Sequence, residues 1–195
     1  MKSVFIRVIA SAFMLTGFAV LNLTAQSSIP ANLEVPAGNA LFLVTSAAGT
    51  QNYVCLPGKN KNDVAWRFLG PQATLFGGEQ VATHFLSVNP VEGSIARPTW
   101  QHSIDTSRVW GRVKSSSADP AYVAPGAIPW LLLEAAGTEA GPTGGGILAQ
   151  TTFIQRVDTA GGVAPADGCS EDEHIGKVAL VPYTTDYFFY RKAED

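Results

Sequence analysis

The sequence has 195 residues, with 13 lysines and arginines against 16 aspartates and glutamates, a formal net charge of −3. A mildly acidic chain without a basic run argues against nucleic acid and against an anionic membrane surface as partners. Its length suits one globular domain that is large enough for a proper core.

The N-terminus has the layout of a secretory signal peptide. Lys2 and Arg7 precede an almost uninterrupted apolar run, Val8–Leu21, and small and polar residues follow. Cleavage after Ala25 is expected, so that residues 1–25 are the signal peptide and residues 26–195 a single all-β domain, secreted or periplasmic. An uncleaved anchor is the alternative, since residues 4–23 are about long enough to span a bilayer. No later apolar stretch is long enough to do so.

Short runs of β-branched and aromatic residues dominate the mature chain, and no apolar pattern of period 3.6 is sustained. Residues 40–56 predict a hairpin, with strands at 40–45 and 51–56 and a turn of small residues at 47–50. The stretches VAWRFLG, ATLFG and QVATHFLSV then predict three short strands, each ended by Gly, Pro or Asn.

A second hairpin is predicted in RPTWQHSIDTSRVWGRVKSSS, with its turn at residues 105–107. IPWLLLEAAG favours a buried strand over a short helix, and GTEAGPTGGG is a glycine-rich loop without the Lys of a phosphate loop. Two long strands end the chain, and aromatic residues on both faces of the last one predict that it is covered on both sides. Eight to ten such strands predict an all-β fold, an antiparallel sandwich or barrel.

The chain has two cysteines, Cys55 and Cys169. Export takes both to an oxidising compartment, which favours one long-range disulfide over two free buried thiols.

Several motifs together resemble the secreted-protein family catalogued as domain of unknown function 3455. They are GTQNYVC, WRFLGPQATLF, RPTWQHSIDTSRVWG, IPWLLLEA, QRVDTAGGVAPADGC and VPYTTDYFFY, which cover nearly all of the mature chain in order. The resemblance implies a signal peptide and supports the pairing of Cys55 with Cys169. The segment from Ser87 to Ala96 is longer than the family pattern.

Some fungal members of that family carry a malate dehydrogenase label. The sequence gives it no support, because no G-x-G-x-x-G follows a strand and strands do not alternate with helices. The resemblance therefore implies export and fold class, and no activity.

The second hairpin carries the candidate ligand-binding residues. With a three-residue connection, His102 would lie opposite Trp110, and Trp100 opposite Arg112. Indoles, an imidazole and guanidiniums on one face would suit a small molecule or glycan with an anionic group. A two-residue connection would separate the two strands' sets, and the alternative for the tryptophans is the core. The candidates are Trp100, His102, Arg108, Trp110 and Arg112, joined by His84 on the preceding strand.

His84 and His102 with a carboxylate such as Asp105 could instead bind a metal or act as base and orienter, although the spacing matches no metal signature. No G-x-S-x-G elbow is present, so no catalytic residue is assigned. Glu134 and Asp158 are expected in turn-capping or surface roles. GCSEDEHIG is expected to be a solvated turn after the disulfide, because three adjacent acids cannot all point at one ion.

Three functions remain open from the sequence. The first is an exported binding or structural module at the cell surface that recognises a small molecule or glycan, without a cofactor or metal. The second is an exported hydrolase or metal-dependent enzyme that uses His84 and His102. The third is a purely structural matrix or stress protein whose aromatic residues all belong to the core.

Overall fold

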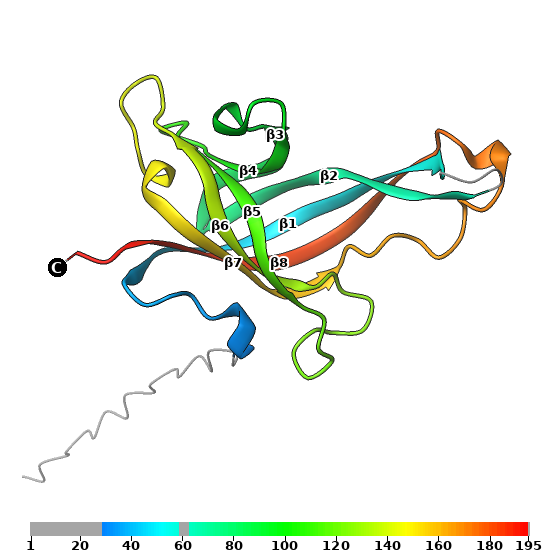
Figure 1. Ribbon diagram of the computed structural model, residues 1–195, viewed down its shortest axis with the longest axis horizontal. Helices are drawn as coiled ribbons and strands as arrows, with labels where there is room; N and C mark the ends of the chain where they lie inside the picture. Colours follow the sequence, from blue (N-terminus) through cyan, green and yellow to red (C-terminus); the bar gives the residue numbers. More distant parts are fainter. Residues whose placement is uncertain (1–28, 59–62, 195) are drawn as a thin grey trace, which may run out of the picture.

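The computed structural model describes residues 29–58 and 63–194, which form an antiparallel barrel of eight strands (Figure 1). Each strand pairs with its neighbours in the sequence, and the last strand pairs with the first. The predicted all-β fold is therefore confirmed as a closed barrel, while the predicted signal peptide lies outside the described residues and stays a prediction. The strands are β1 (Asn39–Pro57), β2 (Val64–Gly77), β3 (Glu79–Val88), β4 (Ala96–His102), β5 (Arg108–Ser117), β6 (Trp130–Glu139), β7 (Thr151–Gly161) and β8 (Val178–Lys192).

Four single turns of 3-10 helix lie between or before the strands. They are η1 (Ala31–Leu33), η2 (Pro90–Glu92), η3 (Leu148–Gln150) and η4 (Asp172–His174). Within the described ranges there is no helix of the length and apolarity needed to cross a membrane.

The first predicted hairpin is wrong, because residues 39–57 form one strand of 19 residues. The small residues at 47–50, which were expected to form a turn, instead allow β1 to pack closely against its neighbouring strand. A Cβ atom on Gly49 would overlap the carbonyl oxygen of Gln72 and the backbone of Ala73 on β2. Glycine here lets two adjacent strands approach as the barrel bends.

The predicted division of β2 into two short strands is also wrong. Gly70, at a φ of 146°, and Pro71 lie inside one strand, where the pairing with β1 shifts register next to Asn52. Gly-Pro therefore marks a bulge in a continuous strand and not a strand end. The predicted strands in QVATHFLSV and IPWLLLEAAG and the two long final strands are confirmed as β3, β6, β7 and β8.

The barrel has an inner core and an outer cover. Inside, one cluster of buried side chains includes Leu75, Trp100, Ile154, Tyr187 and Phe189. Outside, η1 and the segment between β5 and β6 bring Leu33 and Val123 onto Trp130, Leu132 and Val157. Phe188 is packed against this outer cluster while its neighbours Tyr187 and Phe189 face inward, so β8 is covered on both sides as predicted.

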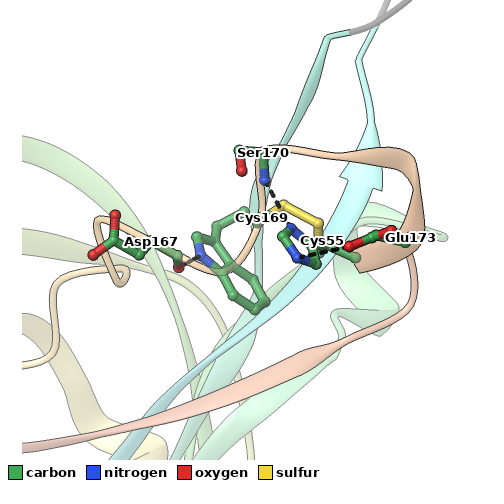
Figure 2. The surroundings of a disulfide bond; sticks show 7 residues. Cys55, Asp167, Cys169, Ser170 and Glu173 are labelled. Atoms are coloured by element: carbon green, nitrogen blue, oxygen red, sulfur yellow. Dashed lines mark hydrogen bonds and ion pairs between the residues drawn. A yellow bond between two sulfur atoms is a disulfide. The ribbon is translucent and has the colours of Figure 1, made fainter.

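β1, β2 and β8 reach beyond the body of the barrel as a long three-stranded ribbon (Figure 1). At its far end Cys55 and Cys169 form the predicted disulfide, across a sequence separation of 114 residues (Figure 2). The indole nitrogen of Trp66 donates a hydrogen bond to the carbonyl oxygen of Asp167 at 3.0 Å, beside the bridge. The disulfide thus fixes the segment before β8 onto the end of β1, as is typical of proteins in oxidising compartments.

We expect the double variant Cys55→Ala, Cys169→Ala to lose about 4 kcal/mol of unfolding free energy, because the bridge closes a loop of 114 residues in the unfolded chain. Urea unfolding followed by far-UV circular dichroism measures the loss. Wild-type protein reduced with dithiothreitol should lose a similar amount, and the double variant Ser116→Ala, Ser170→Ala, at two exposed serines, should lose much less. A loss below about 1 kcal/mol in the cysteine variant would contradict a stabilising role for the bridge.

Candidate functional site

A cavity of about 280 Å³ lies inside the barrel, at the end from which the long ribbon extends. Its walls are largely apolar and aromatic, with Pro71, Pro98, Leu131 and Leu133 beside Trp100 and Tyr187. The polar side chains of Gln51, His84 and Arg156 also line it, as does Tyr53, whose hydroxyl donates to the Gly162 carbonyl at 2.6 Å. The interior of an eight-stranded barrel can be filled by side chains or can hold one small ligand, and this barrel has room for a ligand in part of its interior.

The cavity is closed at one end and open at the other. At the closed end, buried side chains fill the interior of the barrel; they are those of Leu75, Val109, Ile154 and Phe189, together with Leu148 of η3. At the other end Phe68 and Val113 line the cavity while 52% and 51% of their side chains remain exposed. The space is therefore a blind pocket with an apolar rim, reached from solvent between the ends of the strands.

His84 and Trp100 form the inner wall of the cavity. They are cross-strand partners on β3 and β4, and their rings stack with centroids 4.2 Å apart and an interplanar angle of 11°. Tyr187 meets Trp100 edge to face at a centroid distance of 5.4 Å. The Trp100 ring has room because position 111 is glycine, where a Cβ atom would lie 2.9 Å from Cζ3. The stack is thus held rigidly by its neighbours on three strands.

The protonation state of His84 follows from its surroundings. Its Nδ1 lies 2.9 Å from the carbonyl oxygen of Thr99, which can only accept, so Nδ1 carries the proton. Burial lowers the pKa of His84 to about 3, against the opposing effect of the Thr99 hydrogen bond. The imidazole is therefore neutral at pH 7, with a lone pair on Nε2, which makes no hydrogen bond to any described residue.

Several polar groups of the cavity wall make no short hydrogen bond. Nine buried side-chain nitrogen and oxygen atoms of the described residues lack one, and four of these belong to residues that line the cavity: Gln51 Nε2, Trp100 Nε1, Arg156 Nε and Tyr187 Oη. The Tyr187 hydroxyl interacts with the Arg156 guanidinium and with the Tyr183 hydroxyl, which in turn interacts with Gln51. These groups therefore hold one another in place in the wall.

Arg156 is the charged residue of the cavity wall. Its Nη2 donates to the carbonyl oxygen of Pro129 at 2.7 Å, which holds the side chain along the wall. Burial raises the pKa of Tyr187, and the nearby Arg156 guanidinium opposes this rise because it favours the phenolate. Asp and Glu do not occur among the described residues that line the cavity, so its electrostatic potential is set by a cation.

The predicted register of the second hairpin is wrong. Trp100 pairs with Val109 and Thr99 with Trp110, so Trp100 and Trp110 lie on opposite faces of the sheet. The connection is longer than the predicted three residues, because the hydrogen bond from the His102 N–H to the Ser107 carbonyl closes a turn around Ser103–Thr106. An odd shift in register moves one strand's residues to the other face. The proposed common surface of the six candidates therefore does not form.

The remaining hairpin candidates lie outside the cavity. Trp110 is 2% exposed and donates from Nε1 to Ser87 Oγ at 2.9 Å, at the start of the long segment from Ser87 to Ala96. Arg112 pairs with Glu134 at 2.6 Å, and Arg108 donates to Gln101 at 2.8 Å. These side chains are engaged by the protein itself on the outer surface.

His102 and His84 are not brought together as a pair. His102 faces its own turn, where its Nδ1 lies 3.0 Å from Asp105 Oδ1 and accepts from the Asp105 N–H at 3.2 Å. Asp105 also accepts from the N–H of Ile147 at 2.9 Å, which joins this turn to the glycine-rich loop. His102 and Asp105 thus organise the closed end of the barrel, and the metal or base–orienter group expected from His84, His102 and Asp105 is not assembled.

The acidic stretch after Cys169 forms the short turn η4. Asp172 stands apart, whereas ligand atoms of Glu171, Glu173 and His174 lie within 4.8 Å of one another. His174 accepts from the Ser170 N–H at 3.2 Å and lies 4.0 Å from Glu173 (Figure 2). The expected solvated turn is present, and two of its three acids converge more closely than expected. Exposed acidic groups of this kind are common without an ion.

Sequence reasoning missed Gln51, Arg156 and Tyr187 as cavity residues. One signal was available for Arg156, because it lies two residues after Ile154 and so on the same, inward face of a predicted strand. A charged residue at an inward position is the unusual observation that marks a site.

We expect the stability of the protein to fall as the pH drops below 6.5. The folded His84 pKa of about 3 lies below the ordinary value of 6.5, so the unfolded chain binds the proton first and is favoured by acid. Between pH 6.5 and pH 5 this group should cost about 1.5 kcal/mol of unfolding free energy. Urea unfolding at both pH values measures the difference.

The variant His84→Gln should lose most of this pH dependence, whereas His174→Gln in η4 should keep it. An equal pH dependence in the wild type and in His84→Gln would contradict the neutral, buried state of His84.

The sequence matches the model of one protein family. The family described as "Protein of unknown function (DUF3455)" matches residues 36–191, from just before β1 to the penultimate residue of β8. Comparisons with curated proteins and with solved structures give no match. The matched residues comprise nearly the whole barrel, including both disulfide cysteines and every residue of the cavity wall. The chain therefore belongs to the DUF3455 family of proteins of unknown function.

Proposed function

We propose that this protein binds a small molecule inside its barrel, in a secreted or periplasmic setting. The observation that carries the proposal is the cavity of about 280 Å³, whose largely apolar wall includes the Arg156 guanidinium and the neutral imidazole of His84. A ligand that paired with these two groups would offset their desolvation cost and would gain apolar contact with the walls. The disulfide and the N-terminal signal pattern support the extracytoplasmic setting.

Binding is favoured over catalysis by the composition of the wall. Among its described residues there is no Ser, Thr, Cys, Lys, Asp or Glu to act as nucleophile or proton carrier beside His84. Of its two tyrosines, Tyr53 donates its hydroxyl to the Gly162 carbonyl at 2.6 Å, and burial raises the pKa of both. The Nδ1 of His84 is oriented by a backbone carbonyl, which fixes the ring, but burial outweighs the rise in pKa that this hydrogen bond gives and leaves the imidazole a weak base. The cavity is thus better suited to holding a molecule than to changing it.

The position of the aromatic residues favours a small molecule over a glycan chain. Trp100 and Trp110 are 1% and 2% exposed, so neither presents an open ring for a sugar on the outer surface. A blind pocket accepts one compact ligand, whereas a glycan chain needs an open groove along the surface.

We expect ligands found in a metabolite screen by thermal shift to lose binding when the cavity is filled. Saturating ligand at about 100 times its Kd adds about 2.7 kcal/mol to stability, which for a domain of this size raises Tm by roughly 5 to 10 °C. Leu131→Trp fills the wall, and Val113→Trp narrows the half-exposed rim. Both should reduce the shift to near zero.

Leu180→Trp is the matched control, because Leu180 is 59% exposed and is not part of the cavity wall. It should respond to ligand as the wild type does. A screen in which no compound stabilises the wild type, or one whose ligands stabilise both filled variants equally, would contradict binding inside the barrel.

A further inference from the structure

We infer that the ligand of the cavity is a small aromatic or other compact apolar acid whose carboxylate is bound by Arg156. This inference rests on the proposed function and adds the chemical class of the ligand. Its basis is the guanidinium in the cavity wall, which has no carboxylate partner among the described residues.

Arg156 is the group of the wall that distinguishes an anionic ligand. Its guanidinium carries only N–H donors and cannot accept a hydrogen bond. The Tyr187 hydroxyl, which is fully buried, interacts with this guanidinium and so helps to hold it in the wall. A positioned guanidinium is complementary to a ligand rich in lone pairs, as a carboxylate is.

The charge of the wall favours an anion over a neutral acceptor. No carboxylate oxygen lies within 4.0 Å of the Arg156 guanidinium in the part of the chain that the structure describes. Its Nη2 donates a hydrogen bond to the Pro129 carbonyl, and the guanidinium also interacts with the neutral Tyr187 hydroxyl, so neither contact supplies a negative charge. A guanidinium beside apolar walls is stabilised by an opposite charge, which the ligand would bring.

The rest of the wall defines the body of the ligand. Apart from the polar residues already named, the cavity is lined by aromatic rings and aliphatic side chains such as Phe68, Leu131 and Leu133. Flat rings pack well against such walls in offset or edge-to-face contact. Its volume of about 280 Å³ is that of about nine water molecules at the bulk-water share of about 30 Å³ each, which suits a single ring with a short acidic side chain.

His84 adds one further requirement. Its Nε2 is the neutral acceptor of the wall, so a hydroxyl or amine on the ring of the ligand could donate to it. A ring substituted with both an acid and a donor would therefore engage the two polar sides of the cavity.

Isothermal titration with trans-cinnamate, 4-hydroxycinnamate and the neutral cinnamamide tests the inference. We expect 4-hydroxycinnamate to bind the wild type most tightly and each acid to bind at least tenfold more tightly than cinnamamide. Arg156→Gln should remove most of the preference for acids, and Tyr187→Phe should reduce it about threefold. Arg112→Gln, which changes an arginine on the outer surface, should leave all affinities unchanged.

The outcomes separate the inference from the proposed function. If cinnamamide or other neutral compounds bind as tightly as the acids and Leu131→Trp still abolishes their binding, the ligand class is wrong and the binding site stands. If acids bind and Arg156→Gln keeps their preference in a variant that unfolds cooperatively, the anion site is also wrong. If neither these compounds nor any from the wider screen bind, the inference and the proposed function both fall.

Discussion

The antiparallel pairing of β8 with β1 is the constraint on which the rest of the structure depends. It runs from Asn39 opposite Lys192 to Val54 opposite Val178 and closes the sheet, so that no strand edge remains in the barrel wall. Closure creates an interior with a fixed diameter, and side chains of very different size must share it. The disulfide at Cys55 lies one residue beyond the end of this pairing and joins β1 covalently to the loop that leads into β8.

Local patterns predicted the strands and the class of fold because burial on one or both sides of a strand leaves a visible alternation. These patterns failed where glycine or proline, which end strands in most proteins, instead allow close packing or a bulge within a strand. Gly49 and the Gly70–Pro71 pair read as strand ends, yet both lie inside strands of a tightly bent barrel. Whether glycine ends a strand or lets two strands approach depends on the partner strand, which is distant in the sequence and invisible to local reasoning.

The candidate site was harder to predict than the fold, because it depends on register. Trp100 and His84 were both selected from their residue types, and both line the cavity, but their companions came from the wrong face of β5. The true companions, Gln51, Arg156 and Tyr187, lie on β1, β7 and β8 and meet only when the barrel closes. Bulges also change which face of the sheet the following residues occupy. One such register shift lies between Val157 and Ala160, where Asp158 has a φ of 50°.

The charge of the cavity wall bears on the choice between a binding protein and a purely structural one. Other polar groups of the barrel serve its architecture: Gln155 donates to the Leu33 carbonyl at 2.7 Å, and Thr159 donates to that of Ile128 at 2.6 Å. Arg156 lines a hollow and has no carboxylate partner among the described residues. A protein selected only for stability would gain from an apolar side chain in its place, since well-packed hydrophobic residues often match or exceed buried charged groups. A lone cation beside a hollow is therefore a cost that binding explains and that a structural role does not.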